Sequence, residues 1–354
     1  MKRYLNFSHR LGVLSQVKLV GRKRKTHTYI YITMSLNHVY KVLLHLTLLF
    51  PDDDDLWDLL VKMWRLSDYR SIHLAVGKLN VDVIVKGLDQ IPPPDTPVYA
   101  EDVEIVPGGA ATNYSVAISR FGHSVKLLSK IGIGPTIKGI MTSLAELGVG
   151  LEYVQEEQYV QSPTLIFLRN DGSISIVRKK NSVPPITREE VNRFAGLFDV
   201  VHFASLPPKL VLRDPYAKVT SYDPGPTVRE IADPLEVDVL FVNNTEAEKL
   251  DMEKVKTRYL VIKKGKNGAT VTSEVEECSV EAIQVDPVDT TGAGDVFDAA
   301  FNFGLAEEWS LEETLQFASV ASGLKVTRLG GTSSPSFQEV VSFLNEKPPK
   351  VKCR

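Results

Sequence analysis

Short apolar runs alternate with helix-like segments through most of this chain, and this alternation limits the possible folds more than any other feature. The runs VVHFA, VTSYD, VDVLFV and YLVI, between residues 200 and 262, have the length and composition of buried strands. Helix-like segments follow Asp295 and Ser310. Parallel strands need a crossover connection, which is usually a helix. The pattern therefore predicts an α/β fold of three layers, with a mostly parallel central sheet and helices on both faces.

The alternation begins at Ile72, and two stretches interrupt it. A strand with a break at Gly77, a glycine turn leading into a helix, a second strand and a second helix are expected in residues 72–85, 107–122, 125–132 and 137–148. The interruptions are residues 86–106, which are rich in proline, and residues 160–180, where Asp171-Gly172 separates two strand-like pieces as in a hairpin. We expect both stretches to form a small β-sheet lid on a single domain that covers residues 71–345.

Both ends of the chain differ from this pattern. Residues 1–70 contain 12 Lys and Arg but 6 Asp and Glu, a net charge of +6, so the remainder carries −9 of the total of −3. We expect residues 1–70 to be a poorly ordered extension, with a basic arm that contacts nucleic acid as the alternative. The folded domain would lose nothing by starting at Met63, which suggests an over-long start. Residues 346–354 are expected to form a basic tail.

The composition argues against several classes of protein. The acidic body disfavours broad nucleic-acid binding, although backbone amides and a metal ion would still allow ATP to bind. Two cysteines, Cys278 and Cys353, are too few for a disulfide framework or a thiolate metal site, and the histidines lack metal-ligand spacing. The best membrane candidate, residues 39–50, is too short and contains Lys41 and His45. We expect a cytoplasmic protein without membrane or nucleic-acid partners.

The run DTTGAGD, residues 289–295, carries the strongest sign of chemistry. Glycines at the start of a helix let backbone N–H groups converge on an anion, and the helix dipole favours negative charge there. Asp295 would lie in the first helical turn, where it could accept a proton beside that anion. Moving a phosphoryl group onto a hydroxyl needs this combination of anion site and base. A glycine turn capped by an acidic first turn is the alternative.

Two further polar sites lie near the start of the predicted domain. Gly108 and Gly109, followed by Asn113, would let the backbone approach a polar ligand, although a glycine turn before a helix needs the same residues. Asp82 follows the first strand, at the end of which α/β proteins place ligand contacts. A carboxylate there can accept hydrogen bonds from two hydroxyl groups of a sugar-like molecule. A solvated aspartate at a strand end is the alternative.

Two motifs that follow later strands would suit a nucleotide and its metal ion. Asn243 and Glu246 could hold a hydrated Mg²⁺, which needs few protein ligands, or could cap a helix. Lys263, followed by Gly265 and Gly268, could place an ammonium group near phosphate, or the segment could be a hairpin turn. The sequence contains neither GxxxxGK[ST] nor a GxGxxG that opens a helix after a strand. A P-loop enzyme and a dinucleotide-binding oxidoreductase are therefore not supported.

The order of four of these motifs, all except Asp82, resembles the ribokinase/phosphofructokinase-B family of carbohydrate and nucleoside kinases. Residues 108–132 match the first family signature, and DTTGAGD followed by Ala299-Ala300-Phe301 matches the second. Residues 243–246 fit the family's NxxE element, and residues 263–268 fit its nucleotide-site turn. Asn302 departs from the usually apolar last position of the second signature. The resemblance covers about residues 72–345 and implies a ribokinase-like α/β/α fold with a β-sheet lid.

The resemblance also implies a role for each motif. Asp295 would be the general base that accepts the proton of a substrate hydroxymethyl group during attack on the γ-phosphorus of ATP, for which an ordinary aspartate pKa suffices. The backbone of Gly292, Ala293 and Gly294 would form an anion hole for the transferring phosphate. The other implied positions are Asp82, Gly108, Gly109 and Asn113 for the substrate, Asn243, Lys263, Gly265, Gly268 and Ser319 for the nucleotide, Glu246 with Asn243 for Mg²⁺, and Asp289 and Thr291, with the backbone around Val326, Gly330 and Ser334, for K⁺.

The predicted reaction is ATP-dependent phosphorylation of a primary hydroxyl of a sugar or sugar acid. A nucleoside kinase of the same family and a catalytically silent sugar-binding relative are the alternatives. Residues 133–135 and 179–181 depart from the residues common in the family and border the lid, so the identity of the sugar stays open. Lys179 and Lys180 would favour an anionic sugar, or they are solvated strand residues. The resemblance also allows a homodimer through the lid.

Overall fold

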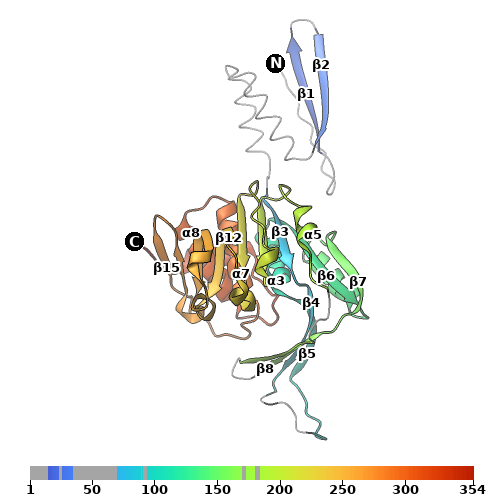
Figure 1. Ribbon diagram of the computed structural model, residues 1–354, viewed down its shortest axis with the longest axis vertical. Helices are drawn as coiled ribbons and strands as arrows, with labels where there is room; N and C mark the ends of the chain where they lie inside the picture. Colours follow the sequence, from blue (N-terminus) through green and yellow to red (C-terminus); the bar gives the residue numbers. More distant parts are fainter. Residues whose placement is uncertain are drawn as a thin grey trace. The chain divides into compact units, whose positions relative to one another are not determined.

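The structure, a computed structural model, divides the chain into two compact units, Met1–Tyr69 and Arg70–Arg354. It describes residues 15–23 and 26–34 by their backbone, and residues 70–354 except 89, 91–93, 170–172 and 180–183. In the first unit, β1 (Ser15–Lys23) and β2 (Thr26–Met34) pair as antiparallel strands (Figure 1). We predicted no regular structure here, although the β-branched and aromatic residues of THTYIYITM favour a strand. The rest of the predicted extension lies outside the described residues.

The second unit is built around a ten-stranded sheet (Figure 1). Its strand order is β16-β15-β14-β13-β12-β11-β10-β3-β6-β7. From β13 to β7 every neighbouring pair is parallel, and from β13 to β16 every pair is antiparallel. The prediction of a mostly parallel sheet is confirmed. The strands are β3 (Ile72–Gly77), β6 (Ser124–Ile133), β7 (Val154–Val160), β10 (Val200–Ala204), β11 (Val219–Asp223), β12 (Leu235–Asn243), β13 (Val255–Lys263), β14 (Ala269–Thr272), β15 (Glu277–Val280) and β16 (Val351–Cys353).

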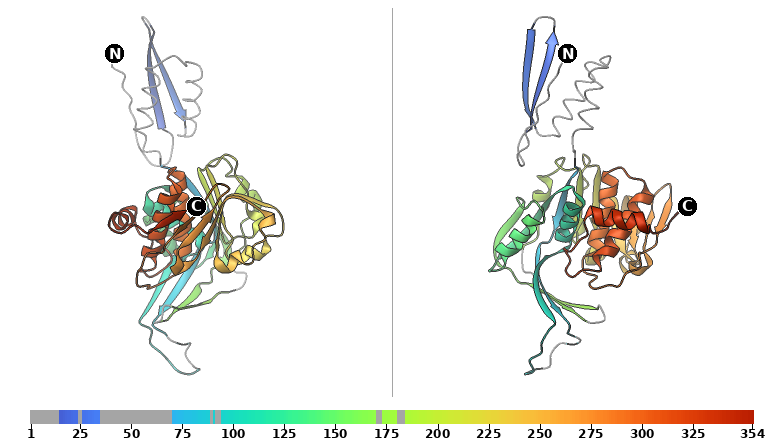
Figure 2. Two further views of the ribbon diagram at one scale, coloured as in Figure 1. Left: turned by 90° about the vertical axis from the view of Figure 1, so that its left-hand side faces the viewer. Right: turned by 180° about the vertical axis from the view of Figure 1, so that it is seen from behind.

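Helices cover both faces of this sheet, which confirms the predicted three layers (Figure 2). Successive residues of a strand point to opposite faces, so Ala75 packs in one core, and Leu74 and Val76 pack in the other. The first core is covered by α3 (Ala110–Phe121), α4 (Ile137–Glu146), α7 (Ala293–Ala306), α8 (Leu311–Lys325) and α9 (Phe337–Glu346), and the second by α5 (Arg188–Asn192), α6 (Asn244–Ala247) and short 3₁₀ turns. Among the described residues, no helix is both long enough and apolar enough to cross a membrane.

A separate four-stranded sheet, in the order β5-β4-β8-β9, forms the lid. Its strands are β4 (Asn80–Lys86), β5 (Asp102–Gly108), β8 (Thr164–Leu168) and β9 (Ile174–Val177). The expected break at Gly77 is the point where the chain leaves the main sheet for the lid. Antiparallel pairing of β8 with β9 confirms the predicted hairpin, although its turn lies outside the described residues. Ile84, Ile166 and Leu168 form a small lid core that packs against Leu329 of the main domain.

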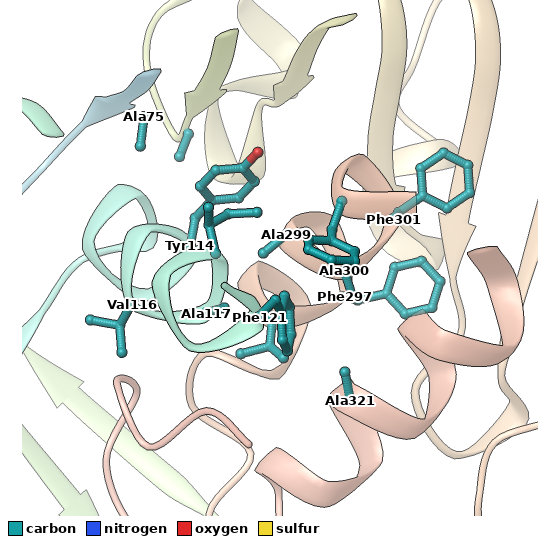
Figure 3. Packing of buried hydrophobic residues seen from close by; sticks show 14 of the residues in the cluster. Ala75, Tyr114, Val116, Ala117, Phe121, Phe297, Ala299, Ala300, Phe301 and Ala321 are labelled. Atoms are coloured by element: carbon teal, nitrogen blue, oxygen red, sulfur yellow. The ribbon is translucent and has the colours of Figure 1, made fainter. Parts of the chain in front are cut away.

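Helices α3 and α7 lie side by side, and their contact positions the candidate site. Tyr114 and Phe121 of α3 lie on the side of Ala299 of α7, whereas Phe297 and Phe301 of α7 point away from α3 (Figure 3). All five side chains are buried. The small side chain of Ala299 lets the helix axes approach closely, as interlocking helix surfaces require. The first turns of two helices that are far apart in the sequence therefore come to the same place.

Asn302, which departs from the family signature, is part of a buried hydrogen-bond network. Its Nδ2 donates to the hydroxyl of Tyr114 at 3.1 Å and to Oγ of Ser221 at 2.7 Å. The same two oxygens contact His73 and His202, at 2.9 Å each. A buried polar side chain is tolerated when it is hydrogen-bonded. The asparagine therefore fits here because its neighbours are polar as well.

The C-terminal residues belong to the main sheet. We predicted a basic tail over residues 346–354, but β16 pairs with β15 and extends the sheet by one strand. A disulfide joins Cys278 of β15 to Cys353 of β16, which are 75 residues apart in the sequence. The small number of cysteines gave no reason to expect this bond. It forms because the strand register places the two residues opposite each other.

Candidate active site

Asp295 and Asn113 meet where two helices begin. Helix α3 starts at Ala110 and helix α7 at Ala293, so both side chains lie in the first turn or just after it. Nδ2 of Asn113 donates a hydrogen bond of 2.7 Å to Oδ2 of Asp295. The predicted base and a predicted substrate residue are thus in direct contact, although 182 residues separate them in the sequence.

The glycine turn before α7 has a conformation that suits an anion. Gly292 is the N-cap, and its φ of 77° lies in the left-handed region that favours glycine. A Cβ at this position would lie 2.7 Å from the carbonyl oxygen of Gly331. The N–H of Ala293 donates to the carbonyl of Thr290 at 3.2 Å. The N–H groups of the next two residues belong to the first helical turn, where a helix has no carbonyl of its own to bond them.

Asp289 holds this turn against the loop that follows α8. Its Oδ1 accepts the N–H of Thr291 and its Oδ2 accepts the N–H of Gly330, both at 2.8 Å. Asp289 is buried. The hydroxyl of Thr291 is also buried and has no hydrogen-bond partner among the described residues. The carboxylate of Asp289 therefore acts as a clamp between the two segments that build the site.

Lys325 lies behind the same turn. It is the last residue of α8 and is completely buried. Its Nζ donates to the carbonyl oxygens of Asp289 at 3.0 Å and Arg328 at 3.1 Å. Burial lowers the pKa of Lys325 to about 8, and the charges of Asp289 and Asp295 limit this decrease. The ammonium form therefore predominates at neutral pH.

Lys263, at the end of β13, also lies close to the turn. Its Nζ donates to Asp223 at 2.6 Å and to Asp298 at 2.8 Å, and it lies 3.2 Å from the position that a Cβ would take at Gly294. Burial raises the pKa of Asp298, and Asp223 adds to this effect. Burial acts on Asp223 in the same direction, but Lys263 and neighbouring hydrogen bonds lower its pKa overall. Asp223 therefore supplies the negative charge that balances Lys263.

The predicted substrate residues include two buried acceptors without a donor. Oδ1 of Asp82 and Oδ1 of Asn113 have no hydrogen-bond partner among the described residues. A Cβ at Gly108 would overlap Oδ2 of Asp82, so glycine is needed there to leave room for the carboxylate. At Gly109, φ is 100° and a Cβ would overlap the carbonyl of Lys78. An unsatisfied buried acceptor costs about 1–3 kcal/mol. A ligand with hydroxyl groups would remove this cost.

Burial raises the pKa of the two aspartates. It raises the pKa of Asp295 to about 6, and the hydrogen bond from Asn113 opposes the increase. It raises the pKa of Asp82 to about 6, opposed by the hydroxyl of Thr164 and the charge of Arg178. The sequence required only an ordinary aspartate at position 295. The structure provides a stronger proton acceptor, because the packing of α3 and α7 removes solvent from the carboxylate.

Asn243 and Glu246, the predicted magnesium residues, form a capping box at the start of α6. Oδ1 of Asn243 accepts the N–H of Glu246, and Oε2 of Glu246 accepts the N–H of Asn243, each at 2.9 Å. This is the helix cap that the sequence left as the alternative. The box leaves Oε1 of Glu246 outside its two bonds. A magnesium ion that keeps most of its water needs only one or two carboxylates, so this pair fits it.

The predicted nucleotide turn joins β13 to the antiparallel strand β14, as in the hairpin alternative. Gly265 and Gly268 have φ of 56° and 82°. The turn begins directly after Lys263, whose Nζ lies 3.2 Å from the position that a Cβ would take at Gly294. Ser319, on α8, donates its hydroxyl to the carbonyl of Glu281 at 2.8 Å. The described contacts do not join Ser319 to Asp295.

Comparison with known proteins identifies the family. The model of the pfkB family carbohydrate kinase matches residues 73–337. The chain belongs to the pfkB family. Ribokinase of Bacillus subtilis (strain 168) is 27% identical over 299 residues, which cover 77% of this chain and 98% of that protein. ATP-dependent ribose-1-phosphate kinase of Halopiger xanaduensis is 28% identical over 291 residues, which cover 77% of this chain and 98% of that protein. The crystal structure of a putative ribokinase II from E. coli in complex with ATP and Mg²⁺ has a TM-score of 0.64 at 18% identity, and covers 78% of this chain and 100% of its own.

Membership of the pfkB family confirms the predicted family, fold and enzyme class, a carbohydrate kinase. Three residues of the site were not predicted. Asp298 lies one helical turn after Asp295, and Asp223 ends a strand, so both carried a signal that a position-based search could have found. Lys325 carried no such signal, because a lysine in the last turn of a helix is ordinary.

Proposed function

We propose that this protein transfers the γ-phosphoryl group of ATP to a primary hydroxyl group of a sugar or sugar acid. The observation that carries the proposal is the pair of buried acceptors, Oδ1 of Asp82 and Oδ1 of Asn113, together with the hydrogen bond from Asn113 to the carboxylate of Asp295. Two unpaired acceptors require two donors, and adjacent sugar hydroxyls supply two donors at a fixed separation. The E. coli relative in complex with ATP and Mg²⁺ supports the choice of phosphoryl donor.

Asp295 is the general base of this proposal. The substrate oxygen forms a bond to the γ-phosphorus while the bond from that phosphorus to the bridging oxygen breaks, and ADP leaves. The hydroxyl proton passes to the Asp295 carboxylate late in the step. Asn113 orients this carboxylate through the 2.7 Å hydrogen bond. Because proximity and orientation make up much of the catalysis of phosphoryl transfer, this contact is central to the reaction.

The glycine turn stabilises the charge on the transferring group. The N–H groups of Gly294 and Asp295 are the main donors of the anion hole, since that of Ala293 is bonded to Thr290. Glu246, with Asn243, would hold a hydrated Mg²⁺, which neutralises phosphate charge when it is bound. The backbone of the turn after β13 would line the nucleotide.

A ribose-like sugar is the substrate class that we favour, because curated relatives over nearly their whole length are named ribokinase and ribose-1-phosphate kinase. Arg178 of the lid acts on the pKa of Asp82 through its charge. A positive side chain near the sugar site favours a sugar that carries an anionic group. Lys179 lies beside Arg178 and is exposed, whereas Lys180 lies outside the described residues.

We also propose that the outer face of the lid pairs with a second copy of the chain. The strand register places Val83 beside Ile105 and Val85 beside Val103, so one face of the lid is apolar. Val103 and Ile105 are 58% and 54% exposed. Contiguous exposed apolar surface usually marks an interface. Light scattering should give twice the 39.3 kDa of one chain, and a monomer that binds its sugar normally would contradict this proposal.

A coupled assay of ADP release tests the reaction. The compounds are ribose, ribose 1-phosphate, fructose, 2-keto-3-deoxygluconate, adenosine and cytidine, each with ATP and Mg²⁺. We expect turnover of at least one sugar, and its loss in Asp295→Asn. Turnover of nucleosides alone would make the protein a nucleoside kinase. Sugar binding in calorimetry without any ADP release would indicate a sugar-binding relative and refute the proposal.

A further inference from the structure

Lys325 is a buried lysine that is held by carbonyl groups. Lysine is almost never fully buried unless it is paired, yet this side chain has an exposed fraction of 0%. Its hydrogen bonds go to the backbone carbonyls of Asp289 and Arg328. It forms no ion pair with a carboxylate among the described residues. A cation surrounded by carbonyl oxygens is the arrangement that proteins use for a bound metal ion.

The two carbonyls belong to the two segments that build the glycine turn. Asp289 is the first residue of DTTGAGD, and Arg328 lies in the loop that also gives the N–H of Gly330 to the Asp289 carboxylate. The ammonium group therefore ties the turn to the loop. It also places a positive charge behind the start of α7, where negative charge develops during phosphoryl transfer. The hydrogen bonds of the Lys325 ammonium group and its positive charge thus both act on the glycine turn.

The family resemblance led us to expect a K⁺ ion in this place, and the residues do not fit one. The carbonyl of Asp289 is bonded by Lys325, and both of its carboxylate oxygens accept N–H groups. The carbonyl of Val326 accepts two backbone N–H groups, at 2.7 and 3.0 Å, and that of Gly330 accepts the hydroxyl of Ser333 at 2.6 Å. The oxygens of Asp289, Val326 and Gly330 are thus already in use, whereas the hydroxyl of Thr291 is an expected ligand that has no partner among the described residues. A second cation beside the ammonium would also be repelled.

We propose that Lys325 is a built-in monovalent cation: its ammonium group holds the glycine turn and supplies the charge behind it, so that catalysis needs no K⁺. The proposal rests on the phosphoryl transfer proposed above. Lys325 is a positioning residue, because it reaches the phosphoryl group only through the turn that it holds.

Three variants of the full-length protein test this. Lys325→Ala removes the ammonium group and opens space beside the carbonyls of Asp289 and Arg328, where a K⁺ ion could enter. Lys325→Met removes the charge but fills the space with a side chain of similar length. Lys347→Ala, at an exposed position after α9, controls for the loss of a lysine.

The first measurement needs no substrate. Thermal unfolding of each protein is followed in KCl and in tetramethylammonium chloride at the same ionic strength. Wild type, Lys325→Met and Lys347→Ala should have the same midpoint in both salts. Lys325→Ala should unfold at least about 2 °C higher in KCl, because an ion that binds only the folded protein stabilises it.

The second measurement is ADP release with the sugar that the wild type phosphorylates. The wild-type rate should differ by less than about twofold between the salts, as for ordinary screening. In tetramethylammonium chloride, Lys325→Ala should lose about 10- to 10³-fold, the range for one preorganised group at an anion hole. KCl should restore most of this loss. Lys325→Met should lose as much and should not recover.

A wild type whose midpoint or rate depends on K⁺ would overturn the proposal, even if the variants fail to fold. Full activity of both Lys325 variants without K⁺ would overturn it as well. So would a Lys325→Ala variant that KCl does not restore, since the side chain would then only fill space. If none of the tested sugars makes the wild type release ADP, the proposed function fails. The thermal comparison still decides the role of Lys325 in that case.

Discussion

Replacing Asp295 with asparagine should slow the reaction and stabilise the fold at the same time. The two side chains have the same shape, and an asparagine can turn its Oδ1 toward Nδ2 of Asn113, so the 2.7 Å contact is kept. The amide cannot accept the substrate proton. We expect kcat to fall about 10²- to 10⁴-fold, the usual contribution of a general base. The KM for the sugar should change little, because Asp82 and Asn113 are intact.

The gain in stability follows from the raised pKa. In the unfolded chain the carboxyl titrates near 3.8, whereas in the folded protein its pKa is about 6. Between these values the folded protein holds a proton that the unfolded chain has lost, so stability decreases as the pH rises through this window. Above about pH 6 the ionised Asp295 lowers the free energy of unfolding by its full amount, which is about 3 kcal/mol at most because the side chain keeps some contact with solvent. Asparagine has no charge to bury and does not cause this loss.

Two pH series test these expectations. The thermal midpoint of Asp295→Asn should exceed that of the wild type by up to about 8 °C near pH 7.5, and the difference should shrink toward pH 4. Wild-type kcat/KM should fall below about pH 6, by tenfold per pH unit, or more steeply if Asp82 must also be ionised. A variant with a rate within about threefold of the wild type would refute the assignment of the base. A stability difference that does not depend on pH would refute the raised pKa.

Three other substitutions separate binding, backbone geometry and charge balance. Asp82→Asn should lower kcat/KM for the sugar about 10- to 100-fold, through KM, and should leave the KM for ATP unchanged in steady-state kinetics. Gly292→Ala should lower the free energy of unfolding in urea by about 1–2 kcal/mol and reduce kcat, because Gly292 has a φ of 77° and its added Cβ would meet the Gly331 carbonyl. Gly139→Ala is the control, because no heavy atom lies within 4 Å of its added Cβ, and it should be neutral or stabilising. Lys263→Met should lower the unfolding free energy by about 3–5 kcal/mol, because two carboxyls then face each other without a cation; a smaller loss would mean that they already share a proton.

Much of the fold could be predicted because its signals are local. The apolar run at β10 and the glycine turn before α3 are determined by neighbouring residues, and both lie where the sequence placed them. The order of the motifs then led to the pfkB family. The hairpin of β1 and β2 was wrongly left without structure, although its strand-like composition was visible. Strand β16 was missed because a strand of three residues shows no periodicity.

The candidate site could be predicted only as a set of motifs. Asp82, Asn113 and Asp295 each had a plain structural alternative in the sequence. The hydrogen bond between Asn113 and Asp295 joins two of them, and no spacing rule gives a contact across 182 residues. The raised pKa of Asp295 also has no local cause, because burial by another helix produces it.

The sequence by itself determined the family, the reaction class and the positions of the motifs, since these depend on short runs such as DTTGAGD that act through their own backbone. Only the tertiary structure decided which charges meet. It placed Lys263 between Asp223 and Asp298, and it placed the ammonium group of Lys325 against the carbonyl of Asp289. Electrostatic interactions depend on distance in space and on exclusion of water, and neither quantity is encoded at a single position of the chain.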